Sequence, residues 1–286
     1  MSSVRDLLAE ARARLAGTSP EPRLDSEVLL AFALKRERTW LFAHPETGLA
    51  EADAARFHAL VQQRVRGVPV NYLTGRREFW SLALAVTPDT LIPRPETEQL
   101  VEIVLELDLP RNARVLDLGT GSGAIALALG QERPDWRLVA TDRSAAALAV
   151  AAGNAKRLAL ANIAFASGDW FDALPAGAIF DLVVSNPPYI PDADPHLARG
   201  DLRFEPRDAL ASGEDGLRDL GAIIDRAPEF LRPGGWLWLE HGFDQREAVM
   251  AMLAQRGFRD CRHHADAAGN PRNSGGRWES GSRTGT

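Results

Sequence analysis

The sequence has almost no cysteine. Cys261 is the single cysteine among 286 residues, which excludes an intramolecular disulfide framework and any cysteine-based zinc cluster. The six histidines are scattered, and the adjacent pair His263 and His264 would point to opposite faces of a strand, which is poor geometry for chelation. We therefore expect no metal site.

Long apolar runs are also lacking. No apolar stretch approaches the roughly 18 residues that a membrane-spanning helix needs. The opening stretch, MSSVRDLLAEARARLAG, interleaves charges with leucines, which favours an amphipathic helix over a signal peptide. We expect a cytoplasmic protein with no membrane partner.

Positive charge is in deficit. The chain carries 33 Lys and Arg against 39 Asp and Glu, a formal net charge of −6. The deficit lies in residues 91–286, which have 21 basic against 28 acidic residues, whereas residues 1–90 are nearly neutral with 12 against 11. A protein that holds a phosphate backbone usually has the opposite bias over its working domain, so we expect no direct nucleic-acid partner.

The residue pattern changes character once along the chain. Residues 1–75 place apolar side chains at helical spacing, as in PRLDSEVLLAFALK, and are predicted to form a helical domain. Residues 76–93 alternate apolar and polar side chains around Pro88 and Asp89, which predicts a β-hairpin linking two domains. The segment 269–286 is low in complexity, and its role is not evident.

Residues 94–286 alternate between helical and strand patterns. Helices are expected at 96–107, 123–132, 144–158, 219–231 and 245–257, and strands at 113–118, 137–142, 163–169, 180–186 and 234–242. This alternation predicts an α/β domain with a mostly parallel sheet covered by helices on both faces. In open sheets of this kind, ligands bind beyond the carboxyl ends of the strands.

The first strand of this domain ends in a glycine-rich turn. In VLDLGTGSGAIALALG, Gly119, Gly121 and Gly123 allow a tight turn and close backbone approach to a ligand at a helix N-terminus. Gly119 and Gly121 together with Ala124 also satisfy a dinucleotide-binding fingerprint, so the turn alone does not choose a cofactor.

The second strand ends at Asp142, 23 residues after Gly119. A carboxylate there can accept hydrogen bonds from both hydroxyls of a ribose, whether the nucleoside belongs to NAD or to S-adenosylmethionine. Capping of the next helix is the alternative role, which Ser144 could share.

The strand at 180–186 ends in Asn186, Pro187, Pro188 and Tyr189. The Asn186 side-chain oxygen and the Pro187 carbonyl can accept both hydrogens of one planar NH₂ group, and the Tyr189 ring offers a face for stacking. Such an amide nitrogen is a poor nucleophile because its lone pair is delocalised, and two fixed acceptors would turn that lone pair toward an electrophile. This arrangement suits attack on a sulfonium methyl and gives no help to hydride transfer.

With these motifs, the chain resembles the class I methyltransferases that modify exocyclic or amide nitrogens. The stretches LTGRREFWSLALAVTPDTLIPRPETE, GDWFDAL, NPPYIPDADPHLARGDLRFEP and LEHG resemble, over most of residues 20–245, the peptide-chain release factor glutamine-N5 methyltransferases. That family acts on the glutamine of the Gly-Gly-Gln loop of class I release factors. The resemblance implies a Rossmann-like methyltransferase domain at 94–286, S-adenosylmethionine as cofactor, release factors as the protein partner and a monomeric enzyme.

The resemblance also implies roles for particular residues. The turn from Gly119 through Thr120, Gly121 and Ser122 to Gly123 would line the methionine and ribose part of S-adenosylmethionine, with Asp142 at the ribose hydroxyls. Trp170 would pack near the adenine, although it also suits a core aromatic role. Asn186 to Tyr189 would hold the glutamine, with Asn186 close to both ligands.

The segment RPETE precedes the first helix of the methyltransferase domain. Arg94 and Glu98 are expected to order the loop over the cofactor, although helix capping explains Glu98 almost as well.

Other readings stay open at this point. A glutamine methyltransferase of a ribosomal protein is the nearest alternative, and a DNA adenine-N6 methyltransferase and a binding module that retains a cofactor pocket are more distant. One region departs from the family pattern, because the family usually ends in an apolar strand whereas NPRNSGGRWESGSRTGT is rich in Gly, Ser and Arg. We expect a short, ragged last strand or a disordered end there.

Overall fold

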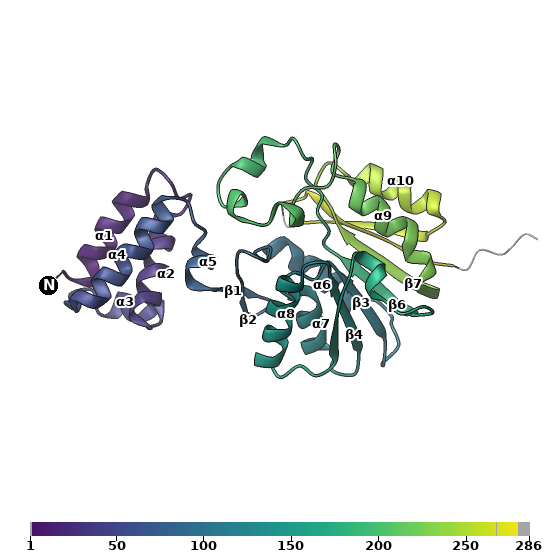
Figure 1. Ribbon diagram of the computed structural model, residues 1–286, viewed down its shortest axis with the longest axis horizontal. Helices are drawn as coiled ribbons and strands as arrows, with labels where there is room; N and C mark the ends of the chain where they lie inside the picture. The colour runs from purple at the N-terminus through teal and green to yellow at the C-terminus, as the bar shows by residue number, and fades with distance from the viewer. Residues whose placement is uncertain (1, 267, 280–286) are drawn as a thin grey trace, which may run out of the picture. The chain divides into compact units, whose positions relative to one another are not determined.

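The computed structural model describes residues 2–266 and 268–279 (Figure 1). The chain divides into two compact units. The first takes in the chain up to Arg76 together with Ala198–Phe204, and the second comprises Arg77–Leu197 and the chain from Glu205 onward. In the described part of the chain, no helix has the length and apolar character required to cross a bilayer.

The first unit is helical. Its helices are α1 (Val4–Leu15), α2 (Pro22–Leu34), α3 (Arg38–Ala43), α4 (Glu51–Val65) and α5 (Val70–Thr74). Helix α1 starts at a capping box, in which Ser3 and Asp6 each satisfy a backbone N–H of the other. The apolar faces of the helices in this unit meet in one core that includes Leu7, Leu30 and Phe57.

An ion pair network lies inside this helical unit. Arg64 on α4 is 3% exposed, and its guanidinium lies 2.6 Å from Asp25 and 2.7 Å from Asp201. Two carboxylates therefore compensate one buried cation, as burial of a charge requires. Asp201 comes from the segment Ala198–Phe204, so this contact ties the segment into the helical unit.

A two-stranded hairpin follows, made of β1 (Arg76–Phe79) and β2 (Leu82–Ala85). Its turn is formed by Trp80 and Ser81, with φ of 52° and 59°. The hairpin lies within the predicted segment 76–93, but its turn is at Trp80 and Ser81 and not around Pro88 and Asp89. Two consecutive residues in the left-handed region give the backbone twist that a two-residue hairpin loop needs. The dipeptide Trp80-Ser81 does not signal such a turn in the sequence.

The second unit contains a seven-stranded sheet in the order β5-β4-β3-β6-β7-β9-β8. The strands are β3 (Arg114–Leu118), β4 (Arg137–Asp142), β5 (Ile163–Ser167), β6 (Phe180–Ser185), β7 (Leu231–Glu240), β8 (Arg259–Ala265) and β9 (Pro271–Arg277). Strands β3 to β7 pair in parallel, while β9 runs antiparallel to both neighbours. The predicted mostly parallel α/β sheet is confirmed.

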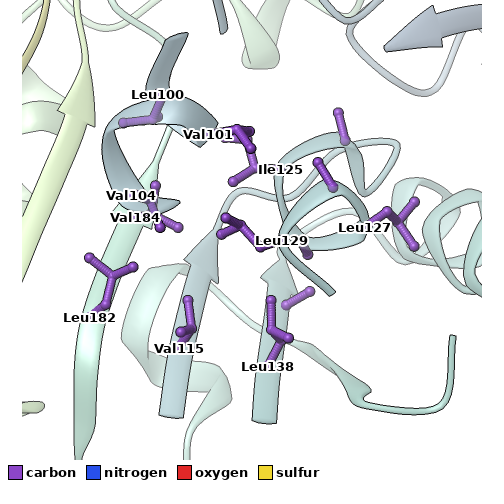
Figure 2. Packing of buried hydrophobic residues seen from close by; sticks show 14 of the residues in the cluster. Leu100, Val101, Val104, Val115, Ile125, Leu127, Leu129, Leu138, Leu182 and Val184 are labelled. Carbon is purple, nitrogen blue, oxygen red and sulfur yellow. The ribbon is translucent and has the colours of Figure 1, made fainter. Parts of the chain in front are cut away.

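Helices cover both faces of this sheet. Helices α6 (Glu98–Leu105), α7 (Ala124–Glu132) and α8 (Ala145–Arg157) lie on one face, and α9 (Arg218–Arg226) and α10 (Arg246–Arg256) on the other (Figure 1). Figure 2 shows the first layer, where Leu100 and Leu129 from the helices meet Val115 and Leu182 from the strands. The next residues along those strands, Leu116 and Val183, face the other core, so both faces are buried and the strands are almost continuously apolar.

The expectation for the end of the chain is wrong over residues 271–277. Strand β9 is a seven-residue strand between β7 and β8, and Asn273 to Gly276 are buried. Glycine is needed here, because a Cβ on Gly275 would lie 2.3 Å from the ring of Trp238 and one on Gly276 would lie 2.9 Å from Phe258. The missing side chains make room for aromatic neighbours. Residues 280–286 of the predicted ragged end lie outside the described residues.

Candidate active site

A cavity of about 280 Å³ opens at the carboxyl ends of β3, β4 and β6, which are neighbours in the sheet. Six of the predicted site residues line it: Gly119, Gly121, Asp142, Trp170, Asn186 and Pro188. Five others lie outside its lining: Thr120, Ser122, Gly123, Pro187 and Tyr189. The topology therefore brings the three unusual strand ends to one cavity.

The glycine turn forms one wall. Gly119, Gly121 and Gly123 have φ of 68°, 56° and 89°, a region that disfavours a side chain, and Gly123 is the N-cap of α7. A Cβ on Gly119 would lie 3.1 Å from the Trp170 ring, whereas one on Gly121 would meet no described atom within 4 Å. The wall at Gly121 is thus bare backbone beside open space.

Thr120 and Ser122 lie outside the cavity lining and support the turn. Thr120 is buried, and its hydroxyl donates to Asp117 at 2.6 Å. The Ser122 carbonyl accepts from the fully buried Asn154 at 2.8 Å. Asn154 also bonds to Ala85 of the hairpin, so one amide links the turn, α8 and β2.

Sequence reasoning missed Asp117. It lies on β3 with 1% exposure, and its Oδ2 accepts from the Thr120 hydroxyl and from the Ala126 N–H. Burial raises the pKa of Asp117 to about 7, with a smaller contribution from the charge of Asp142. Its Oδ1 is buried without a hydrogen-bond partner among the described residues. A carboxylate inside an otherwise apolar strand, VLDL, was the available signal.

Asp142 is part of the turn as well as of the cavity wall. Its Oδ2 accepts the Gly121 N–H and its Oδ1 accepts the Ser144 N–H, both at 2.9 Å. The N-cap of α8 is Ser144, whose hydroxyl accepts the Ala147 N–H. Helix capping therefore belongs to Ser144, and the Asp142 carboxylate is fixed by two backbone donors at the edge of the cavity.

Trp170 begins a short 3₁₀ turn after β5 and has an unusual φ of 46°. Its ring lies against the backbone of Gly119 and forms part of the cavity lining. Trp170 is half-buried, and an indole ring on a cavity lining suits stacking with a planar group.

The two ends of Asn186–Tyr189 are bonded differently. Asn186 lines the cavity, and its Nδ2 donates to Thr97 Oγ1 at 3.1 Å. The Tyr189 hydroxyl donates to the buried Glu240 at 3.1 Å, and burial beside Glu240 raises the pKa of Tyr189 far above its usual range. Tyr189 thus stays a neutral phenol.

Two further segments of the lining were not foreseen. They are Pro88–Leu91, after the hairpin, and the chain around Pro206, Asp208 and Ala209. One buried carboxylate holds these two segments together. Glu205 pairs with Arg94 at 2.5 Å and also accepts the Ile92 N–H at 3.0 Å.

Arg94 therefore braces the segment that leads into the cavity wall. The Glu98 carboxylate accepts the Trp80 N–H in the hairpin turn at 2.8 Å, and its expected role over the cofactor loop stays a prediction.

Comparison with known proteins agrees with this architecture. Residues 109–268 match the family model described as "Methyltransferase domain", and residues 6–75 match "PrmC N-terminal domain". Among solved structures, a methyltransferase from Pyrococcus furiosus covers 69% of this chain and 89% of its own, with a TM-score of 0.53 and 17% identity. The hMettl16 catalytic domain covers 84% of this chain and 85% of its own, with a TM-score of 0.58 and 17% identity.

The fold, with its cavity at the ends of β3, β4 and β6, defines a class I methyltransferase, and the chain is an enzyme.

Curated relatives narrow the class. The release factor glutamine methyltransferase of Xylella fastidiosa is 54% identical and covers 85% of this chain and 88% of its own length. Those of Salmonella typhimurium and Bordetella pertussis are each 50% identical, with coverage of 91% and 96% of this chain and 94% and 99% of theirs. The chain belongs to the release factor glutamine methyltransferase family.

Proposed function

We propose that this enzyme transfers a methyl group from S-adenosylmethionine to the side-chain amide nitrogen of the glutamine in the Gly-Gly-Gln loop of class I release factors. The observation that carries the proposal is the placement of Asn186 and Pro188 on the same cavity as the glycine turn and Asp142. The names of the curated relatives favour this substrate over a ribosomal protein or DNA. We propose that it works in the cytoplasm as a monomer.

The cavity residues fit S-adenosylmethionine. Bare backbone at Gly121 leaves space for a ligand, and Asp142 is held by backbone donors with its carboxylate on the cavity, where it can accept from ribose hydroxyls. Trp170 offers a ring for the adenine. Asp89, Asp169, Asp208 and Asp219 line the same cavity, and Arg143, which also lines it, pairs with Asp208 at 2.6 Å. The remaining excess of carboxylates favours a ligand that carries positive charge.

The cofactor supplies an electrophilic methyl group on a sulfonium, and the protein supplies alignment of the nucleophile. Asn186 Oδ1 and the Pro187 carbonyl would accept the two N–H hydrogens of the glutamine amide and turn its lone pair toward the methyl group. Proline fixes φ at Pro187 and Pro188, so the carbonyl direction is set before the substrate arrives. Alignment of this kind contributes on the order of 7–11 kcal/mol to lowering a barrier.

Proton removal needs no dedicated base in this scheme. After transfer, the N-methylated amide carries one proton more than the neutral product, and it is a strong acid that water removes. The residues of the chain then have to align the amide and exclude competing water, and none of them has to take up the proton.

The test is mass spectrometry of a purified release factor incubated with the enzyme and S-adenosylmethionine. We expect one added methyl, localised by fragmentation to the Gly-Gly-Gln glutamine. The matched control is a release factor whose glutamine is changed to asparagine, which should gain nothing. Methylation of that control, or of a ribosomal protein in its place, would contradict the proposed substrate.

A further inference from the structure

The buried amide of Gln245 bonds directly to the Asn186–Tyr189 stretch, although Gln245 lies outside the cavity lining. Gln245 is 7% exposed and is the N-cap of α10, shortly after the end of β7. Its Nε2 donates to the Tyr189 carbonyl at 2.9 Å and to the Asp215 carbonyl at 3.3 Å. Its Oε1 accepts the Gly242 N–H at 2.8 Å. Both ends of the amide are therefore bonded to backbone groups.

The orientation of this amide is fixed by its partners. A backbone N–H can only donate and a carbonyl can only accept, so Oε1 has to face Gly242 and Nε2 has to face Tyr189. The Gln245 backbone is held as well. Its N–H donates to the Gly242 carbonyl and its carbonyl accepts the Val249 N–H, both at 3.0 Å. The start of α10 is therefore a fixed support for the Tyr189 carbonyl.

Gly216 lies against the other side of this contact. Its φ is 76°, and a Cβ there would lie 2.2 Å from the Tyr189 carbonyl oxygen and 2.6 Å from Gln245 Nε2. Only a residue without a side chain lets the backbone approach the bonded pair so closely. The Tyr189 carbonyl is thus enclosed between Gly216 and the amide that donates to it.

Two further contacts hold this end of the stretch. The Tyr189 hydroxyl donates to Glu240 at 3.1 Å, and the next residue, Ile190, pairs with Ala211 in an isolated bridge. Together with the bond from Gln245, these contacts fix Tyr189 at its hydroxyl, its carbonyl and the following residue.

The chain between Asn186 and Tyr189 is stiff. Proline fixes φ at Pro187 and Pro188, and each proline also restricts the residue before it to extended backbone. A shift of the Tyr189 peptide is therefore passed on to the Pro187 carbonyl and to Asn186, because little freedom remains between them to absorb it.

We propose that Gln245 is a positioning residue for methyl transfer, which holds the Tyr189 peptide and thereby sets the direction of the Pro187 carbonyl and the Asn186 side chain. The proposal rests on the proposed function, because it assigns Gln245 a purpose in that reaction. A misplacement of about 1 Å can lower a rate about 100-fold, so loss of this support should appear in kcat.

The sharpest test is Gln245→Glu, because one proton then decides whether the contact forms. When protonated, the glutamate can donate to the Tyr189 carbonyl and accept the Gly242 N–H, as the amide does, whereas the ionised form can only accept. Burial favours the protonated form at low pH. We expect kcat of the variant, divided by that of wild type at the same pH, to fall on the order of 10- to 100-fold as pH rises from about 5 to about 9.

Two controls accompany this ratio. Kd for S-adenosylmethionine should stay within about threefold of wild type at each pH. Wild type carries the same charged and titratable neighbours, so their effect divides out of the ratio; they are Asp215, Glu240, His241, Asp244, Arg246 and Arg272. A constant ratio would overturn the proposal. So would a ratio that falls only where urea unfolding shows that the variant is no longer folded.

A second pair of variants disturbs the contact and leaves the amide in place. Gly216→Ala puts a Cβ against the Tyr189 carbonyl, whereas Gly177 has the same φ of 76° and its Cβ would meet no described atom within 4 Å. Alanine brings the same backbone strain at both positions, so the difference between the variants isolates the displacement of Tyr189. We expect kcat of Gly216→Ala to be at least about 10-fold below that of Gly177→Ala. Equal kcat values would count against the positioning role.

A readout independent of turnover separates this proposal from the proposed function. The chain has two tyrosines, Tyr72 and Tyr189, so protein labelled with ¹³C at the tyrosine carbonyl gives two signals, which Tyr72→Phe assigns. A carbonyl that loses its donor moves upfield. The Tyr189 signal should move in this way in Gln245→Glu as pH rises and stay in place in wild type. A Tyr189 signal that behaves alike in both proteins would refute the contact.

The two failures are then distinguishable. If the Tyr189 signal of Gln245→Glu titrates as expected but wild type adds no methyl to release factors, the proposed substrate is wrong and the contact between Gln245 and Tyr189 is supported.

Discussion

Changing Asp117 to Asn should alter how stability depends on pH. Asp117 is 1% exposed, and burial raises its pKa to about 7 in the folded protein. An unfolded chain would give it a pKa of about 3.9. The folded state therefore retains this proton to higher pH than the unfolded state, so the free energy of unfolding falls as pH rises from about 4 to about 7.

The size of the effect follows from the two pKa values. A shift of about 3 pH units at about 1.4 kcal/mol per unit sets an upper size of about 4 kcal/mol. Between pH ~5 and pH ~8 the change is about 2 to 3 kcal/mol, because part of the shift lies below that interval. Asparagine keeps an oxygen for the Thr120 hydroxyl and the Ala126 N–H but cannot titrate in this range.

The assay is urea unfolding of wild type and Asp117→Asn at both pH values, followed by tryptophan fluorescence. Six of the seven tryptophans lie after Arg77, so the signal reports mainly on the unit that contains Asp117. Other groups titrate equally in both proteins and cancel in the difference. Relative to the variant, wild type should lose stability on going to pH ~8. Parallel pH profiles for the two proteins would refute the assignment of a buried, proton-retaining Asp117.

Three further substitutions, one of them with a matched glycine control, test the site and the sheet. Asn186→Ala should abolish most turnover while weakening S-adenosylmethionine binding at most moderately, as isothermal calorimetry beside a methylation assay would measure; normal turnover would contradict the acceptor role. Gly121→Ala should weaken cofactor binding, because its φ is 56° and its Cβ would enter the cavity, whereas Gly153→Ala within α8 should stabilise by about 0.5–1 kcal/mol; equal cofactor affinities would count against the turn as a ligand surface. Gly275→Ala should destabilise by roughly 3 kcal/mol or more, since its Cβ would lie 2.3 Å from Trp238; an unchanged urea midpoint would show that β9 is not packed as described.

Periodicity made the sheet readable from the sequence. The strands β3, β4 and β6 are largely buried and read as mostly apolar runs, and each ends at or directly before a residue that is unusual for a strand end. Chain order and parallel pairing then bring those ends together, which is why the sequence alone is enough to assign Gly119, Asp142 and Asn186 to one site.

Features that depend on a distant partner were not readable. Nothing local in NSGG predicts a strand, because those residues become strand only when Trp238 and Phe258 cover the space that their missing side chains leave. Asp117 is a different case, because its partners, the Thr120 hydroxyl and the Ala126 N–H, are local and only the folded turn brings them onto its carboxylate. The roles of Glu205 and Glu240 depend on partners more than 50 residues away in the chain.

The place of β9 has a consequence for how the protein is made. Strand β8 leaves the ribosome before β9. In the sheet, however, β9 lies between β7 and β8 and is bonded to both. Until β9 emerges, β7 presents an open edge that includes the largely buried Trp236, Leu237 and Trp238. An unpaired apolar edge invites pairing with another chain. A nascent chain stalled between β8 and β9 would therefore be the form most in need of a chaperone, even though every residue that lines the cavity has already been synthesised.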